Sequence, residues 1–238
     1  MNLPNKLTLM RIILVPVFLW FYYVSPLGAI KAGIVQYGTH NIPGAFDRVS
    51  GFIPAAGFLA LAVFVIASAT DAADGHIARS RGLITNFGKL MDPLADKILT
   101  TAAFVAFVDT NIIPAWMLIV ILAREFAITG LRGVAASEGV VIPAGATGKY
   151  KTVFQMACIA LFLLAGALIP FFASGQPLTM NISAGGLIWG VSPILLLTGG
   201  VVQVVSIIAI ACLWAAVVLT VISGVEYLWR GRHLLNAK

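Results

Sequence analysis

The sequence is short of charged residues. Only 10% of its 238 residues are Asp, Glu, Lys or Arg, whereas 60% are hydrophobic and the mean hydropathy is +1.00. A water-soluble domain needs far more charged surface, so this composition excludes that class and indicates an integral membrane protein. Cysteine is also scarce. Cys158 and Cys212 lie far apart in apolar runs, which disfavours a disulfide or a cysteine-ligated metal.

Acidic residues are both rare and concentrated. Four of the nine in the chain fall between Asp71 and Asp96, after an apolar run at 52–69 and before another at 98–108. Carboxylates at the ends of hydrophobic segments are costly unless something compensates their charge, so they indicate a functional site. A solvated charged turn between two membrane helices is the simpler explanation for any one of these residues, but not for the whole set.

Six apolar runs have the length and composition of membrane-spanning helices. The third is short if counted from Ile98. It reaches spanning length when extended back to Gly88, which places Asp92 and Asp96 on the helix near the membrane surface. The sequence therefore predicts an all-α integral membrane protein in a single domain, residues 1–238, with six transmembrane helices. These are Leu7–Val24, Gly51–Ser68, Gly88–Val108, Ile112–Leu131, Thr152–Phe172 and Val201–Tyr227.

The distribution of Lys and Arg predicts the orientation. They gather at both termini and in the second and fourth connections, whereas the opposite side holds only Lys31 and Arg48. Positively charged connections stay on the cytoplasmic side of a membrane. We therefore expect both termini and the acidic stretch on that side. The net charge of +6 follows from this topology and does not indicate nucleic-acid binding. We expect the long connections 26–50 and 174–200 on the opposite side of the membrane. The first is predicted to be a loop, and the second is either an interfacial segment or a re-entrant turn.

The spacing of the aspartates predicts a metal site. Asp71 and Asp74 are three residues apart, and Asp92 and Asp96 are four apart, so each pair lies on one face of a helix. Two helices turned toward each other would bring the four carboxylates together. Their mutual repulsion would protonate them unless a cation held them. Hard oxygen ligands of this kind suit Mg²⁺ or Mn²⁺.

Small residues and one arginine complete this stretch. Gly75, Ala78 and Gly88 leave the backbone accessible to a large ligand, and Arg79 can hold a phosphate with two hydrogen bonds. Carboxylates for metal, an arginine for phosphate and small residues for close approach together indicate that the site handles a diphosphate.

The stretch resembles the signature of the CDP-alcohol phosphotransferase family at every fixed position. The residues that carry the resemblance read Asp71-x-x-Asp74-Gly75-x-x-Ala78-Arg79, then eight residues, then Gly88-x-x-x-Asp92-x-x-x-Asp96. The flanking segments Asn2–Arg11, Arg124–Arg132 and Gly148–Thr152 resemble one bacterial branch of that family. Enzymes of this branch transfer a phosphatidyl group from CDP-diacylglycerol to glycerol 3-phosphate. The long connections 26–50 and 174–200 depart from the family pattern.

The resemblance implies roles for the signature residues. Asp71, Asp74 and Asp92 would hold two divalent metals, with Mg²⁺ expected and Mn²⁺ possible, and Asp96 would approach one metal and act as general base. The CDP site would be lined by Gly75, Ala78, Arg79 and Gly88, with Arg79 on the diphosphate. It further implies a homodimer in the bacterial cytoplasmic membrane, with the active site facing the cytoplasm.

Five cations outside the signature are candidates for the acceptor's phosphate: Arg11, Arg124, Arg132, Lys149 and Lys151. Each has a simpler alternative. Arg11 could snorkel to the membrane interface, Arg124 and Arg132 could form structural ion pairs, and the two lysines could mark a cytoplasmic helix end. The next alternatives for function are the same chemistry with inositol phosphate, serine or phosphatidylglycerol as acceptor. A remote one is an ion-coupled transporter, which predicts midplane carboxylates and a repeat that this sequence lacks.

Overall fold

The computed structural model describes residues 3–31, 53–81, 86–137, 139, 146–172 and 200–235. Within the helices, the side chains of residues 3–8, 29–31, 53–54, 71–94, 96, 146 and 230–235 lie outside the description. The described residues form seven helices and no strand, which confirms the predicted all-α class. The helices are α1 (Leu3–Tyr23), α2 (Pro26–Lys31), α4 (Ile53–Arg81), α5 (Asn86–Asp109), α6 (Ala115–Ser137), α7 (Ala146–Phe172) and α9 (Gly200–Leu235).

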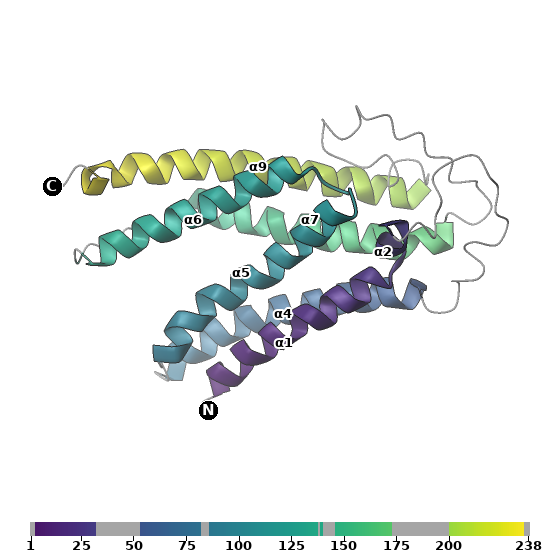
Figure 1. The fold of residues 1–238 in the computed structure, drawn as a ribbon, viewed down its shortest axis with the longest axis horizontal. Coiled ribbons are helices and arrows are strands. Elements are labelled where there is room, and N and C mark those ends of the chain that lie inside the picture. The colour runs from purple at the N-terminus through teal and green to yellow at the C-terminus, as the bar shows by residue number, and fades with distance from the viewer. Residues whose placement is uncertain are drawn as a thin grey trace.

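The six long helices form an elongated bundle in which successive helices alternate in direction (Figure 1). Each of the six predicted apolar runs coincides with one of them. The N-terminal start of α1 and the C-terminal end of α9 therefore lie toward the same end of the bundle, where α4 also ends and α5 and α7 begin. The short helix α2 corrects the expectation that the chain from Pro26 onward is loop. The rest of that connection and residues 174–199 lie outside the described residues.

Two of these helices are long and apolar enough by themselves to cross a membrane. They are the segments Thr147–Phe172 and Gly200–Trp229, with mean hydropathies of 2.3 and 2.8. Shorter apolar stretches, Leu9–Tyr23 and Ala55–Thr70, belong to α1 and α4. Long apolar helices of this kind agree with a membrane protein. The count of six spans and the side on which the termini lie stay predictions.

The boundary between α5 and α6 differs from the predicted one by three residues. Asn111 adopts a positive φ of 56°, and the Ile112 amide donates to the Phe107 carbonyl at 2.8 Å while the Asn111 amide donates to that of Val108 at 3.0 Å. These two bonds form a Schellman motif, which satisfies the last carbonyls of α5. Because the turn uses residues 110–114, α6 begins at Ala115 instead of Ile112.

An aromatic core joins four helices and fixes their relative positions. Phe18 on α1 contacts Phe64 on α4, with ring centroids 6.1 Å apart. Tyr22 on α1 contacts Phe107 on α5 at 5.8 Å, and Phe107 contacts Phe162 on α7 at 5.5 Å. All five side chains are almost fully buried. The helices that carry the aspartates are therefore held against α1 and α7 by close-packed rings.

A glycine permits the close crossing of α4 and α7. A Cβ atom at Gly57 would lie 2.9 Å from the Ala167 Cα atom, a distance that real Cβ contacts do not reach. Small residues at such crossings let helix backbones approach in membrane proteins. The position of α4, and hence of its aspartates, depends on this contact.

We expect Gly57→Ala to destabilise the protein by roughly 1–3 kcal/mol, because the added methyl group forces α4 and α7 apart. This would lower the apparent Tm in detergent by a few degrees. Gly133→Ala on α6 is the matched control, since a Cβ there meets nothing within 4 Å. It should hold or raise the Tm through helix propensity. Equal effects of the two substitutions would contradict the packing argument.

Candidate active site

The signature aspartates lie on two consecutive antiparallel helices. Asp71 and Asp74 fall in the C-terminal part of α4, and Asp92 and Asp96 fall in the N-terminal half of α5. Both stretches are helical, as the spacing argument requires. Residues three and four apart therefore share one helix face. The two pairs approach the end of the bundle where α4 leads into α5 (Figure 1). Their side chains, and those of Gly75, Ala78, Arg79 and Gly88, are outside the described residues.

The donor chemistry of these aspartates fits a divalent metal. Four carboxylates on neighbouring helices form an all-oxygen set, which suits Mg²⁺ or Mn²⁺. Among the side chains that the structure describes, no group of three His, Cys, Asp or Glu residues is placed to hold a metal. The predicted metal site therefore depends on the four signature aspartates.

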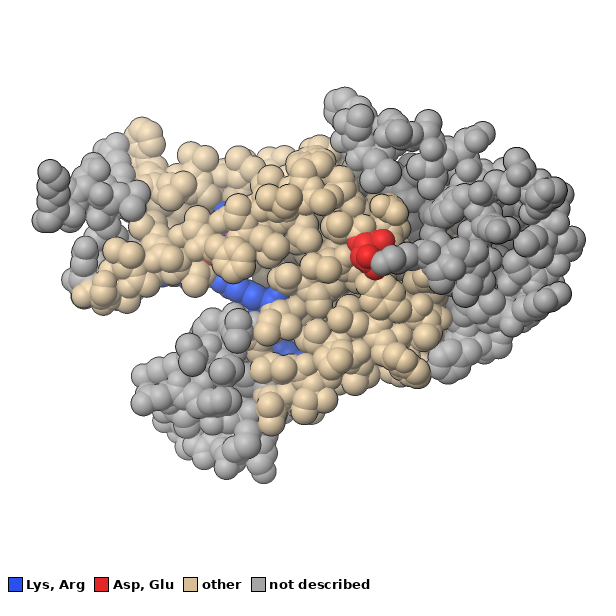
Figure 2. Space-filling model, in the orientation of Figure 1, with Lys and Arg blue, Asp and Glu red and all other residues tan. Residues whose placement is uncertain are grey.

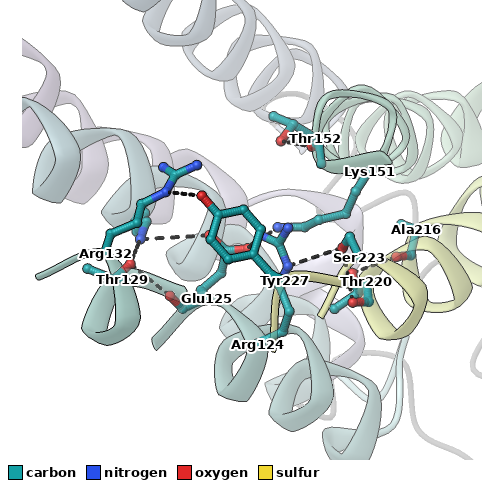
Figure 3. Close-up of polar contacts among 12 residues, drawn as sticks. Arg124, Glu125, Thr129, Arg132, Lys151, Thr152, Ala216, Thr220, Ser223 and Tyr227 are labelled. Carbon is teal, nitrogen blue, oxygen red and sulfur yellow. Dashed lines mark hydrogen bonds and ion pairs between the residues drawn. The ribbon is translucent and has the colours of Figure 1, made fainter. Parts of the chain in front are cut away.

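A second group of charges lies where α5, α6 and α7 meet. Glu125 on α6 accepts hydrogen bonds through Oε1 from Arg124 Nη1 at 2.9 Å and from Lys151 Nζ of α7. Its Oε2 atom lies 3.7 Å from Lys97 Nζ of α5, which also donates to Thr129 Oγ1 at 2.6 Å. Lys151 is buried, with 3% of its side chain exposed. Glu125, Lys97, Arg124 and Lys151 are called the Glu125 cluster below. Figure 3 labels Glu125, Arg124 and Lys151 of this cluster.

The Glu125 cluster carries three positive charges and one negative charge. Their formal sum is +2, and burial strengthens its field relative to the same charges in water. Arginine and lysine groups held in this way are suited to bind a phosphate dianion. Lys97, one member of the cluster, directly follows Asp96 in the chain. The structure therefore places this positively charged group where α5, one of the aspartate-bearing helices, meets α6 and α7.

Arg124 is fixed from three helices. Its Nε atom donates to Ser223 Oγ of α9 at 3.2 Å. Two glycines leave room for it, because a Cβ at Gly224 would lie 3.2 Å from Arg124 Cγ and one at Gly148 would lie 3.4 Å from Nη2. In Figure 3 the Arg124 and Lys151 side chains, from α6 and α7, point toward each other. The guanidinium therefore has little freedom to leave the cluster.

Arg132 belongs to a separate contact nearer the end of α6. Its Nε atom donates to the Tyr227 hydroxyl of α9 at 2.8 Å, and its Cζ atom lies 5.3 Å from the centroid of that ring. One residue earlier on α9, Glu226 accepts a hydrogen bond from Thr147 of α7 at 2.7 Å. These contacts tie α9 to the end of α6 and to the start of α7, so Tyr227 positions the guanidinium of Arg132.

The remaining predicted phosphate ligands lie apart from the Glu125 cluster. Lys149 is exposed at the start of α7 and forms no hydrogen bond or ion pair with any described residue. Arg11 is one of the largest fully buried side chains, at 2% exposure, so it does not extend outward along the surface. It lies on α1, which packs against the two aspartate-bearing helices. The structure thus places Arg11 among the signature helices and groups Arg124 with Lys151.

A cavity of about 80 Å³ adjoins the Glu125 cluster. Its polar lining includes Lys97, Glu125, Lys151 and Gln155. It is completed by Thr100, Thr101 and Thr152 and by the apolar residues Phe104, Leu118, Ile121, Leu122, Phe126 and Met156. Figure 2 shows Lys and Arg atoms gathered in a recess below α6 in that view. A cavity of this size holds more than a single water molecule.

Sequence reasoning missed several of these residues. The sequence pattern singles out Arg124, Arg132, Lys149 and Lys151 but none of Glu125, Lys97, Ser223, Tyr227 and Gln155. One signal was available, because polar residues inside long apolar helices are costly and mark sites. Ser223 and Tyr227, four residues apart on α9, fit that description. Their partners on α6 could not be read from the sequence.

Together, the apolar helices, the composition and the paired carboxylates define a helical membrane protein. A model of the CDP-alcohol phosphatidyltransferase family matches residues 1–225. This chain belongs to that family, which confirms the resemblance carried by Asp71–Asp96.

Individual relatives agree with the family match. The chain is 38% identical over 226 residues, 95% of its length and 93% of the relative's, to the CDP-diacylglycerol–glycerol-3-phosphate 3-phosphatidyltransferase of Bacillus subtilis. It is 33% identical over 163 residues to the protein of the same name from Rickettsia typhi, covering 68% of this chain and 76% of that one. It is also 33% identical over 229 residues to a probable phosphatidylglycerophosphate synthase of Mycobacterium tuberculosis, covering 96% and 81%.

We expect Glu125→Gln and Lys151→Met each to destabilise the protein, because the first leaves three cations without their shared carboxylate and the second removes a buried partner of Glu125. The double variant should lose less than the sum, with a coupling of about 0.5–3 kcal/mol. Unfolding in SDS followed by circular dichroism would measure this. Lys149→Met, at an exposed lysine two residues away, should change little. Additive losses would show that the Glu125–Lys151 contact does not contribute to the fold.

Proposed function

We propose that this protein transfers the phosphatidyl group of CDP-diacylglycerol to glycerol 3-phosphate, giving phosphatidylglycerophosphate and CMP. The observation that carries the proposal is the Glu125 cluster, a partly buried group with net positive charge whose member Lys97 directly follows the signature aspartate Asp96. Its chemistry suits an acceptor that bears a phosphate. Similarity to relatives with this activity in their names, over nearly the whole chain, supports the same conclusion.

The proposal includes a place in the cell. The six long helices would span the bacterial cytoplasmic membrane, with both termini, the signature and the Glu125 cluster at the cytoplasmic face. The excess of Lys and Arg in the connections of that side supports this orientation. Diacyl chains of the donor could then stay in the bilayer while its head group reacts. A homodimer is proposed from the family resemblance.

The signature residues would bind the donor. Asp71, Asp74, Asp92 and Asp96 are the proposed ligands of two Mg²⁺ ions. Charge on the diphosphate and on the departing CMP would be neutralised by these ions when they are bound. The CDP group would lie against Gly75, Ala78 and Gly88, where the backbone is accessible, and Arg79 would hold the diphosphate.

Asp96 would act as the general base. Its carboxylate takes the proton from the primary hydroxyl of glycerol 3-phosphate. That oxygen forms a bond to the β-phosphorus of CDP-diacylglycerol, the bond from this phosphorus to the bridging oxygen breaks, and CMP leaves with that oxygen. The reaction needs no oxidant and no further reactant.

The acceptor's phosphate would bind the cations of the Glu125 cluster. Arg124 and Lys151 are already oriented by Glu125, Ser223 and the two glycines, so little side-chain freedom is lost on binding. Arg132 and Lys149 would add positive charge to the site, and Arg11 would act from the α1 side. Inositol phosphate also bears a phosphate that could bind these cations, so it is the second candidate for the acceptor. Serine carries no phosphate and fits the cluster less well.

The first test is CMP release from CDP-diacylglycerol by the purified protein with Mg²⁺, with and without glycerol 3-phosphate. We expect release that depends on glycerol 3-phosphate and falls by roughly 10²–10⁴ in Asp96→Asn, which removes the base. Asp109→Asn is the matched control on the other end of the same helix, where Asp109 accepts a hydrogen bond from Tyr23 at 2.8 Å. Near wild-type turnover in Asp96→Asn would exclude the assigned mechanism.

Arg124→Gln tests the acceptor site separately. We expect the KM for glycerol 3-phosphate to rise by roughly ten- to a hundredfold, because a charge-assisted contact to the phosphate is lost. The KM for CDP-diacylglycerol, measured in the same preparation, serves as the internal control and should stay close to that of the wild type. Equal increases in both constants would indicate that Arg124 holds the bundle together and does not bind the acceptor.

A further inference from the structure

Gln155 is a polar side chain in a place that the phosphate site does not explain. It lies on α7, is 6% exposed, and lines the cavity beside the Glu125 cluster. Its amide Nε2 atom is buried and has no hydrogen-bond partner among the residues that the structure describes. A buried amide without a partner lowers stability. An apolar residue of the same size would pack there without that cost, so the amide indicates a ligand.

The position of Gln155 relative to the cluster suggests which part of a ligand it meets. It follows Lys151 by four residues, so the two side chains lie on one face of α7, about 6 Å apart along its axis. Lys151 belongs to the charged part of the cavity, whereas Gln155 is neutral. A ligand in this cavity would therefore meet cations at one end and an uncharged hydrogen-bonding group one helical turn away.

The lining residues of α5 connect the cavity to the signature. Thr100 and Thr101 on α5 line the cavity and follow Asp96 by four and five residues. Thr100 is thus one turn along the helix from Asp96. The apolar lining residues Phe104, Leu118 and Met156 suit the carbon atoms of a short chain. A molecule with a phosphate, a short carbon chain and hydroxyl groups matches each part of this lining.

We propose that Gln155 determines acceptor specificity by binding the secondary hydroxyl of glycerol 3-phosphate. This hydroxyl is on the middle carbon of the glycerol chain, beside the carbon that bears the phosphate. The inference rests on the proposed function and adds to it the residue that recognises the glycerol chain. A hydroxyl can accept from the amide NH₂ and can equally donate to the amide oxygen. Either orientation of the Gln155 amide therefore satisfies the contact. A phosphate oxygen would use only one of these orientations.

The test compares two acceptors that differ only in this hydroxyl, glycerol 3-phosphate and 3-hydroxypropyl phosphate. We expect wild-type protein to favour glycerol 3-phosphate in kcat/KM by roughly tenfold or more, because the analogue leaves the buried amide without its partner. In Gln155→Leu the ratio should fall close to one, mainly through poorer use of glycerol 3-phosphate. The apparent Tm of this variant should equal or exceed that of the wild type, since an unpartnered amide is removed.

Gln203→Leu provides the matched control. It makes the same substitution on α9, away from the cavity lining, and should leave the ratio of the two acceptors at its wild-type value. A ratio in Gln155→Leu equal to that of the wild type would overturn the proposal, even if both rates fell. Gln155→Met is a second neutral replacement. Failure of both variants to fold would also overturn it, because the amide would then serve the fold.

The same experiment separates this inference from the proposed function. CMP release by the wild type that depends on glycerol 3-phosphate, combined with an unchanged ratio in Gln155→Leu, would reject the role of Gln155 alone. An absence of CMP release with either acceptor would overturn the proposed function and this inference with it.

Discussion

The arrangement of the charged side chains where α5, α6 and α7 meet depends on Glu125. Within a helical bundle of low polarity, three cations from α5, α6 and α7 share one carboxylate. Buried charges that lack a partner are strongly destabilising, so the carboxylate is what allows Lys97, Arg124 and Lys151 to approach one another. The carboxylate neutralises only part of the positive charge, because one negative charge faces three positive ones. The cluster therefore keeps a net positive charge.

The apolar parts of the fold serve to hold that arrangement in place. The ring contacts among Phe18, Phe64, Tyr22, Phe107 and Phe162 link α1, α4, α5 and α7. The glycine at position 57 lets α4 lie directly on α7. Close-packed interiors transmit small displacements, so a shift of α7 would move Lys151 relative to Glu125. The distances at the charged end are therefore set by packing some turns away.

Sequence reasoning predicted the helices well because each one is a local property of the chain. A long apolar run must form a helix in a membrane so that its backbone N–H and C=O groups are hydrogen-bonded. The signature aspartates are three or four residues apart, so their shared helix face can be predicted from the sequence. The boundary of α6 was misplaced because the positive φ of Asn111 and its Schellman bonds are not visible in hydropathy. The contacts of the site were less accessible. Glu125 and Lys151 are 26 residues apart, and Arg124 and Ser223 are 99 apart, so only the packing of helices brings them together.

The outward and inward faces of α9 show why such a site requires a membrane. Val218, Val221 and Ile222 are each about half exposed, whereas Thr220 and Ser223 are buried. In water this distribution would expose apolar surface and bury polar groups, which is unfavourable on both counts. In lipid the apolar side chains lie in their preferred solvent, and the buried hydroxyls bond to carbonyls of their own helix. Ser223 then donates to the Thr220 carbonyl and also accepts from Arg124, so one inward-facing hydroxyl connects the backbone of a lipid-exposed helix to the charged cluster.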